Sequence, residues 1–206
     1  MQRSKRTIGA LRSALAAALL AGGLTACGSA PPAPEEHYYR LQATYAARTP
    51  MTNPLPGTLE VERFVADGLT SERGLVYSDA ATPNQVKAYY YHFWIKPPTV
   101  MLRDELVAFL REAKAAKAVV TPEVRAHADY VLTGKIEHLE QLTGARERAI
   151  LEIELAVRGA GDGKLIFLKT YRQENASAGG VGATVDALNT ALSIAYADFV
   201  ADLAKR

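Results

Sequence analysis

The strongest constraint on the fold is an alternating segment in the C-terminal half of this 206-residue chain. Every second residue there is a large aliphatic one, at Leu151, Ile153, Leu155 and Val157. Successive side chains of a strand point to opposite faces, so this pattern predicts a strand with one buried face. Glu152 and Glu154 lie between them, which places charge on a wet opposite face and makes them a solvated pair rather than a catalytic one.

Two further segments flank this strand at the distance of a tight turn. Residues 128–141, 146–158 and 164–175 have the composition of long strands, separated by Thr143-Gly144-Ala145 and Gly161-Asp162-Gly163. Glycine tolerates the positive φ that tight turns need. The three segments are therefore expected to form an antiparallel meander.

Two other segments carry apolar residues at helical spacing. The first follows Pro97-Pro98, with Thr99 as its expected N-cap, and its stripe is Leu102, Leu106, Phe109, Leu110 and Ala113. The second, near the C-terminus, has the stripe Val185, Leu188, Leu192, Tyr196, Phe199 and Leu203. Both stripes are wide enough to dock on a sheet.

Shorter strand signals occupy the N-terminal half. Strands are expected at residues 37–43, 74–78 and 85–95, and from Thr58 onward with Leu59, Val61 and Val65 on the buried side. The expected fold class is α+β: a mainly antiparallel sheet with a three-stranded C-terminal meander and two principal helices packed on one face of it.

The first 26 residues have the composition of an export signal, with basic residues, no acid, and a short apolar run from Ala14 to Leu24. The run ends in Leu24-Thr25-Ala26-Cys27, which resembles the bacterial lipoprotein signal, where cleavage leaves an N-terminal cysteine that carries lipid. The alternative is an ordinary signal peptide with a chance cysteine. Cys27 is the single cysteine of the chain and the predicted lipid attachment site.

Three regions follow from this assignment: a lipoprotein signal peptide at 1–26, a lipidated cysteine and proline-rich tether at 27–36, and a single periplasmic α+β domain at 37–206. Four of the 24 lysines and arginines lie in the signal, which leaves 20 basic against 22 acidic residues in the mature chain. Without a basic stripe, no nucleic-acid partner is expected.

No pattern in the mature chain favours catalysis or a cofactor. A nucleophile elbow and a zinc-protease motif are absent from the sequence. The histidines, namely His37, His92, His127 and His138, stand singly and are expected to pack or face solvent rather than bind metal. The glycine-rich loop 177–182 lacks the Lys-Ser/Thr of a phosphate loop. We expect no enzyme, no metal and no cofactor beyond the covalent lipid on Cys27.

An aromatic stretch within residues 85–98 allows two interpretations. On a regular strand, Tyr90, His92 and Trp94 face one way and Tyr89, Tyr91 and Phe93 face the other. The stretch is either one strand of the core, or it presents a row of rings to a partner protein or lipid. For the second interpretation the candidate contact residues are Tyr89, Tyr91, Phe93 and Trp94. Either Tyr89, Tyr91 and Phe93 or Tyr90 and Trp94 would form the row that the helices leave uncovered.

A family pattern runs from Leu59 to Leu110. An early strand leads to Gly68-Leu69, then to Leu75-Val76-Tyr77, then to the aromatic strand from Tyr90 to Trp94, closely followed by proline and a leucine-rich helix. With the lipoprotein signal, this order resembles the ABC-type transport auxiliary lipoproteins, the PqiC-like family. Phe93 stands where that family usually has a basic residue.

The resemblance implies a non-enzymatic lipoprotein that serves an ABC transporter and its periplasmic mammalian-cell-entry (MCE) protein in lipid transport between the two membranes. It implies binding to the MCE protein and allows a homo-oligomer. Gly28 follows Cys27 where aspartate would retain a lipoprotein in the inner membrane, so the outer membrane is favoured. The alternative is an envelope assembly or structural lipoprotein, acting as a chaperone or bound to peptidoglycan.

Overall fold

The computed structural model describes residues 32–46 and 54–206. Residues 36–206 form one compact unit, and all helices and strands of the described residues belong to it. The signal segment 1–26, Cys27 and the first part of the tether lie outside the described residues, so what the sequence predicts for them stays a prediction.

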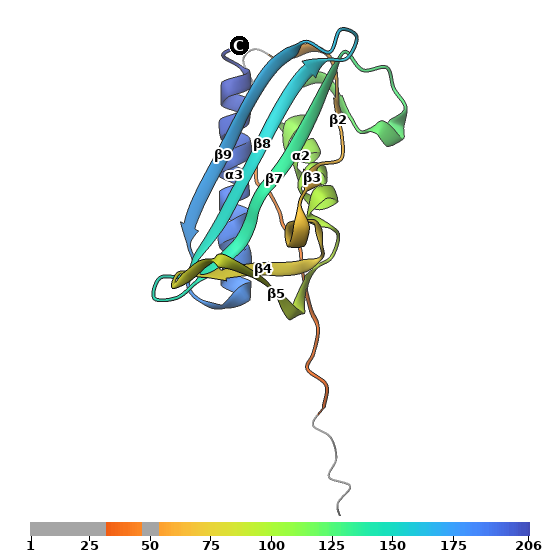
Figure 1. Cartoon of the computed structure of the whole chain (residues 1–206). Helices are drawn as coiled ribbons and strands as arrows, with labels where there is room; N and C mark the ends of the chain where they lie inside the picture. Colours follow the sequence, from red (N-terminus) through yellow and green to blue (C-terminus); the bar gives the residue numbers. More distant parts are fainter. Residues whose placement is uncertain (1–31, 47–53) are drawn as a thin grey trace, which may run out of the picture. The chain divides into compact units, whose positions relative to one another are not determined.

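The elements follow the chain from an edge strand to a closing helix (Figure 1). The strands are β1 His37–Tyr39, β2 Leu55–Val61, β3 Val65–Ala66, β4 Gly74–Asp79, β5 Thr82–Trp94, β6 Ala116–Val120, β7 Tyr130–Thr143, β8 Arg148–Gly159 and β9 Leu165–Ala176. The helices are α2 Pro98–Glu112 and α3 Gly180–Leu203, with short 3₁₀ turns at Gly68–Ser71 and Pro122–Val124.

The predicted meander is confirmed. β7 pairs antiparallel with β8, and β8 pairs antiparallel with β9, over almost their full lengths. The connecting turns use glycines with positive φ, 127° at Gly144 and 67° at Gly163, which an L-residue adopts only at a cost. The alternating aliphatic residues of β8, from Leu151 to Val157, are fully buried, as their period predicts.

The sheet is mixed, so the prediction of a mainly antiparallel sheet is wrong. Among the described strands, β4–β5, β7–β8 and β8–β9 are antiparallel, whereas β2, β3 and β4 all lie parallel to β7 along its other edge. The pairs β1–β5 and β2–β6 are parallel as well. An alternating pattern shows which face of a strand is buried, but not whether the strand runs parallel or antiparallel to its neighbour. The relative direction of two strands depends on the connection between them, and parallel neighbours need a crossover.

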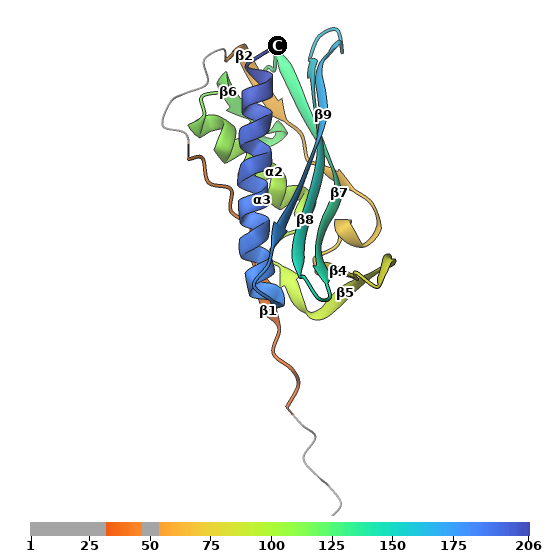
Figure 2. The same ribbon diagram turned by 90° about the vertical axis from the view of Figure 1, so that its left-hand side faces the viewer.

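Both predicted helices are present and lie side by side on one face of the long strands (Figure 2). α3 packs along β8 and β9, and α2 packs beside β6. The buried hydroxyl of Tyr196 on α3 donates a 2.7 Å hydrogen bond to the carbonyl of Leu102 on α2. The apolar stripes of both helices are buried against the sheet, which gives one continuous core.

Two local predictions fail because the backbone departs from regular geometry. Val65 is 59% exposed, and Phe64 is buried in its place, since the chain leaves β2 after Val61 and the alternation shifts by one residue. Thr99 is not the N-cap of α2, because the helix begins at Pro98 after Pro97. Proline suits this first position, where no amide hydrogen is needed.

The segment after β1 is a strap rather than the expected continuation of a strand to residue 43. Side chains of the helices bind its amides: Asn189 accepts from Gln42, and Glu105 accepts from Ala43, at 2.8 and 2.9 Å. Leu41, the residue before Gln42, is fully buried. These contacts fix the chain to the helices directly after β1.

Candidate functional site

The aromatic strand β5 contains a wide bulge opposite β4. The register pairs Val76 with Ala88 and then Gly74 with Phe93, so residues 89–92 of β5 lie opposite Leu75 alone. Gly74 permits this because a Cβ there would lie only 3.3 Å from the Cβ of Ala88. The bulge breaks the regular alternation, and the two predicted rows of rings do not exist as expected.

One flank of the bulge, Tyr89, points into the molecule. Its ring lies 4.4 Å from that of Tyr77, and its hydroxyl donates a 2.8 Å hydrogen bond to Oε1 of Gln141. Gln141 donates in turn to Glu147 Oε2 at 2.7 Å, and the same oxygen accepts the amide of Gly180 at 3.1 Å. Burial, with smaller effects of Tyr77 and Glu147, raises the pKa of the Tyr89 phenol.

The other flank of the bulge, His92, joins β5 to β1. Its ring stacks on that of His37 at 5.0 Å, and its Nδ1 shares a 2.9 Å hydrogen bond with the hydroxyl of Tyr39. The ring also meets the edge of Tyr89 at 5.3 Å. Burial, and then the neighbouring His37, lower the pKa of His92, so the imidazole holds this contact in its neutral form.

A second group of rings lies around Tyr38. Its ring contacts Phe93 at 5.7 Å, and the guanidinium of Arg73 lies 5.6 Å from the same ring. Arg73 also donates a 2.9 Å hydrogen bond to the carbonyl of Trp94, which fixes the guanidinium at the end of β5. Tyr38 remains 53% exposed.

The four candidate contact residues therefore separate. Trp94 is 1% exposed and belongs to the core, so its assignment as a surface contact is wrong. Tyr89 and Phe93 are half-buried, whereas Tyr91 is exposed. Tyr90 is 87% exposed at the bulge although Trp94, of the same predicted row, is buried, so neither predicted row is exposed as a whole.

The glycine-rich loop before α3 is not an open anion site. The amide of Gly180, at the start of the helix, already donates to the carboxylate of Glu147. A carboxylate at a helix N-terminus satisfies the amide and the positive end of the helix dipole. The loop leads from β9 into α3, and its interpretation as a connection stays a prediction.

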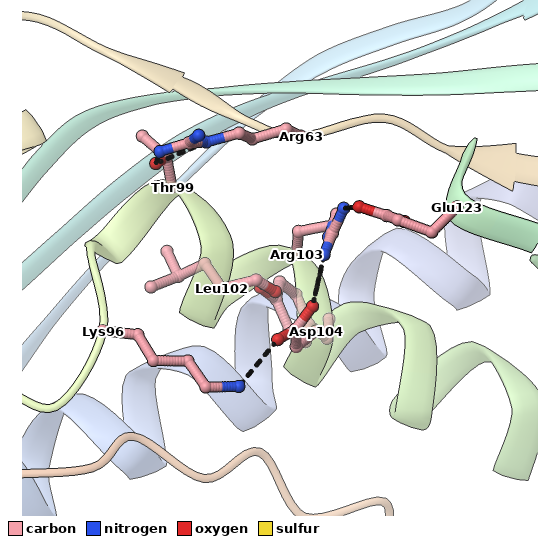
Figure 3. A network of polar contacts seen from close by, with 8 residues as sticks. Arg63, Lys96, Thr99, Leu102, Arg103, Asp104 and Glu123 are labelled. Carbon is pink, nitrogen blue, oxygen red and sulfur yellow. Dashed lines mark hydrogen bonds and ion pairs between the residues drawn. The ribbon is translucent and has the colours of Figure 1, made fainter. Parts of the chain in front are cut away.

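A separate polar network on α2 is structural (Figure 3). Arg103 bridges Glu123 and Asp104 at 2.9 Å each, and Lys96 reaches the second oxygen of Asp104 at 3.1 Å. A hydrogen bond from Thr121, followed by the contact with Arg103, lowers the pKa of Glu123 to about 2. The network fixes the turn after β6 to α2.

Thr99 contributes to the same side of α2. Its hydroxyl accepts hydrogen bonds from Nε and Nη2 of Arg63, both at 3.3 Å (Figure 3). Its carbonyl accepts the amide of Phe64 at 3.3 Å. Thr99 therefore connects the helix to the segment after β2 instead of capping it.

The described ranges, 32–46 and 54–206, contain neither a candidate metal centre nor a candidate membrane-spanning helix. These residues hold no group of three or more His, Cys, Asp or Glu side chains placed to bind a metal ion. No helix there is long and apolar enough to cross a membrane. His138 instead contacts Glu140 and Glu152 on the charged face of the meander.

The model of the ABC-type transport auxiliary lipoprotein component family matches residues 39–200, from β1 to the last turns of α3. The chain belongs to this family. The family resemblance found in the sequence is thereby confirmed and extends over almost the whole folded unit. An auxiliary lipoprotein component of ABC transport implies a transporter partner and an envelope location at a membrane, and the description as an auxiliary component points to a non-enzymatic role.

Solved structures share the fold of this auxiliary lipoprotein at low sequence identity. Protein XCC0632 from Xanthomonas campestris has a TM-score of 0.67 and 18% identity, with 80% of this chain and 91% of that chain covered. The structure of an uncharacterized protein has a TM-score of 0.64 and 17% identity, with 82% of this chain and 99% of that chain covered. A PelC dodecamer from Paraburkholderia phytofirmans has a TM-score of 0.50 and 16% identity, with 77% of this chain and 96% of that chain covered. A search of curated proteins found no match.

Proposed function

We propose that this protein is a lipoprotein anchored through Cys27 in the outer membrane, facing the periplasm, and that it serves an ABC/MCE-type intermembrane lipid transport system by binding the MCE protein. The observation that carries the proposal is the family match, which spans residues 39–200 and so covers the domain rather than the signal alone. The described residues add an α+β body in which no group of three or more His, Cys, Asp or Glu side chains is placed to bind a metal ion.

The anchor and its sorting rest on the sequence. Cys27 follows Leu24-Thr25-Ala26 in the order of a lipoprotein signal, and Gly28 occupies the position that would hold aspartate in a retained inner-membrane lipoprotein. Nine residues separate Cys27 from β1, and a proline-rich chain of that length reaches roughly 28 Å at about 3.1 Å per residue.

The partner is tested by capture from membranes. The lipidated protein, tagged at its C-terminus and solubilised in mild detergent, is expected to retain the MCE protein and components of its ABC transporter. The matched control is Cys27→Ser, which should lose the lipid but keep the folded domain, and so separates lipid anchoring from partner binding. Repeated capture without any MCE protein would contradict the proposed partner, and specific retention of peptidoglycan would favour a structural lipoprotein instead.

Self-association belongs to the same proposal. The PelC protein of similar fold is a dodecamer, and a ring of identical lipoproteins would give a transport system a symmetric collar at the membrane. Native mass spectrometry of the lipidated protein in detergent is expected to give a single closed oligomer. A monomer at all concentrations would contradict this part of the proposal and leave the partner assignment standing.

A further inference from the structure

Exposed tyrosines are concentrated at one place in the fold. Among the described residues, the large apolar side chains that are exposed include three tyrosines, and all three lie on the paired strands β1 and β5. The exposed fractions are 53% for Tyr38, 87% for Tyr90 and 43% for Tyr91. We call these residues the tyrosine surface. Large rings left open to water on a folded domain commonly mark a contact with another apolar phase or molecule.

Two of these rings, Tyr90 and Tyr91, stand on the bulge of β5. Its flanks are fixed from within, because Tyr89 bonds to Gln141 and His92 stacks on His37. Tyr90 and Tyr91 lie between these flanks, in the part of β5 that lies outside the regular ladder with β4. Their exposure therefore comes from a built backbone feature and not from a loose loop.

The tyrosine surface also lies next to the point where the chain enters the domain. β1 is the first element of the folded unit, and Tyr38 is its middle residue, 11 positions after Cys27. Pairing of β1 with β5 brings Tyr38 against Phe93, two residues after Tyr91. Beyond β1, the strap is bonded to α2 and α3, so the rigid body begins beside these rings.

The chemistry of these side chains suits the boundary between lipid headgroups and acyl chains. Tyrosine has an apolar ring and a polar hydroxyl, and it is enriched at that depth in membrane proteins. Arg73 lies over the ring of Tyr38, while Glu36 accepts the hydroxyl of the same tyrosine, so the surface has mixed charge. This favours contact with zwitterionic lipid over a purely electrostatic attraction to anionic lipid.

A protein partner fits the tyrosine surface less well. A stable protein interface needs roughly 800 Å² from each partner, which three side chains cannot supply. A membrane needs no shape-matched partner, and the lipid on Cys27 would hold the domain near it at high effective concentration. A contact too weak to bind vesicles by itself is then occupied most of the time.

We propose that Tyr38, Tyr90 and Tyr91 rest on the lipid–water boundary of the membrane in which Cys27 is anchored, and so orient the domain with β1 and the β4–β5 hairpin toward that membrane. This inference rests on the proposed lipid anchor. It adds an orientation: the opposite end of the sheet, where β8 turns into β9, points into the periplasm.

The test uses depth-dependent fluorescence quenching on the full lipidated protein. Tyr90→Trp places a reporter on the tyrosine surface. Leu165→Trp places a matched reporter at the start of β9, at the far end of the sheet, where the side chain of Leu165 is 56% exposed. Wild-type protein gives the background of Trp94, which is buried. Each protein is reconstituted into phosphatidylcholine vesicles with and without bromine on the acyl chains.

The expected result is that brominated lipid reduces the added fluorescence of Tyr90→Trp at least about twofold and leaves that of Leu165→Trp unchanged, since quenching needs contact at the boundary. Equal quenching of the two variants would overturn the inference. So would protection of Tyr90→Trp by the MCE protein without quenching by lipid, which would assign the surface to a protein.

Vesicle flotation separates this inference from the proposed function. If wild-type protein floats with the vesicles and the two variants are quenched equally, the anchor stands and the orientation is wrong. If the purified membrane form carries no lipid on Cys27 and does not float, the anchor is wrong and the orientation is rejected with it.

Discussion

The hydroxyl of Tyr89 donates a 2.8 Å hydrogen bond to Oε1 of Gln141, and this contact links the bulge of β5 to the long strand β7. Gln141 is almost fully buried and donates to the carboxylate of Glu147. The same carboxylate accepts the first amide of α3. The position of the exposed tyrosines beside Tyr89 therefore depends on a polar chain that runs beneath the bulge.

Removing the Tyr89 hydroxyl tests this chain. Tyr89→Phe leaves the amide oxygen of Gln141 buried without this donor, so the free energy of unfolding should fall by about 1–2 kcal/mol. The matched control is Tyr90→Phe, whose hydroxyl is on an exposed ring and should change stability by less than about 0.5 kcal/mol. Urea unfolding followed by circular dichroism measures both. Equal effects of the two changes would contradict the account of the bulge.

A close contact in the sheet gives a second prediction. A Cβ at Gly134 on β7 would lie 2.6 Å from the ring of Phe64, which is buried, so Gly134→Ala forces the ring or the strand to move. Overpacking of this kind should destabilise the protein by about 1–3 kcal/mol. Gly161→Ala is the control, because nothing lies within 4 Å of its Cβ. Thermal unfolding measures both variants. Equal unfolding temperatures would show that the space between Gly134 and Phe64 can accept a methyl group without cost.

The carboxyl of Glu123 gives a pH prediction. Its pKa in the folded protein is about 2, lowered first by the hydrogen bond from Thr121 and then by Arg103, against an ordinary value of 4.5. A depressed pKa stabilises the folded state above the unfolded value, and this contribution is lost as pH falls from about 4.5 to about 2. NMR titration of the Glu123 side chain measures the pKa directly.

Two variants separate the causes of that shift. Thr121→Val and Arg103→Met should each raise the pKa of Glu123, since the Thr121 hydrogen bond and the contact with Arg103 both lower it in the folded protein. Both should move it toward the ordinary range. A titration in which neither variant differs from wild type would show that the Thr121 and Arg103 contacts do not form in solution.

The meander and the two helices could be predicted because their signals are local. The period of Leu151 to Val157 and the positive φ of Gly144 are properties of short segments, and tertiary contacts did not override them. The parallel pairing of β2, β3 and β4 with β7 could not be predicted this way, because it depends on which segments meet after the chain has crossed the sheet.

The candidate surface was predicted in part for a similar reason. The aromatic stretch was correctly placed on a strand, but the choice of outward rings assumed that alternation continued from Tyr89 to Trp94. Gly74, on the neighbouring strand, admits the bulge that shifts the alternation. The different exposure of Tyr90 and Trp94, which belong to one predicted row, could not be predicted because its cause lies 15 or more residues away in sequence.

The central claim is that the domain is held at a membrane through Cys27, and intact-mass spectrometry of the protein purified from membranes tests it most directly. The account predicts a chain that begins at Cys27 and carries acyl chains, and a Cys27→Ser variant that is not processed at this position and carries no lipid. A mature chain that begins elsewhere or lacks lipid, with a Cys27→Ser variant that still sediments in processed form, would contradict it.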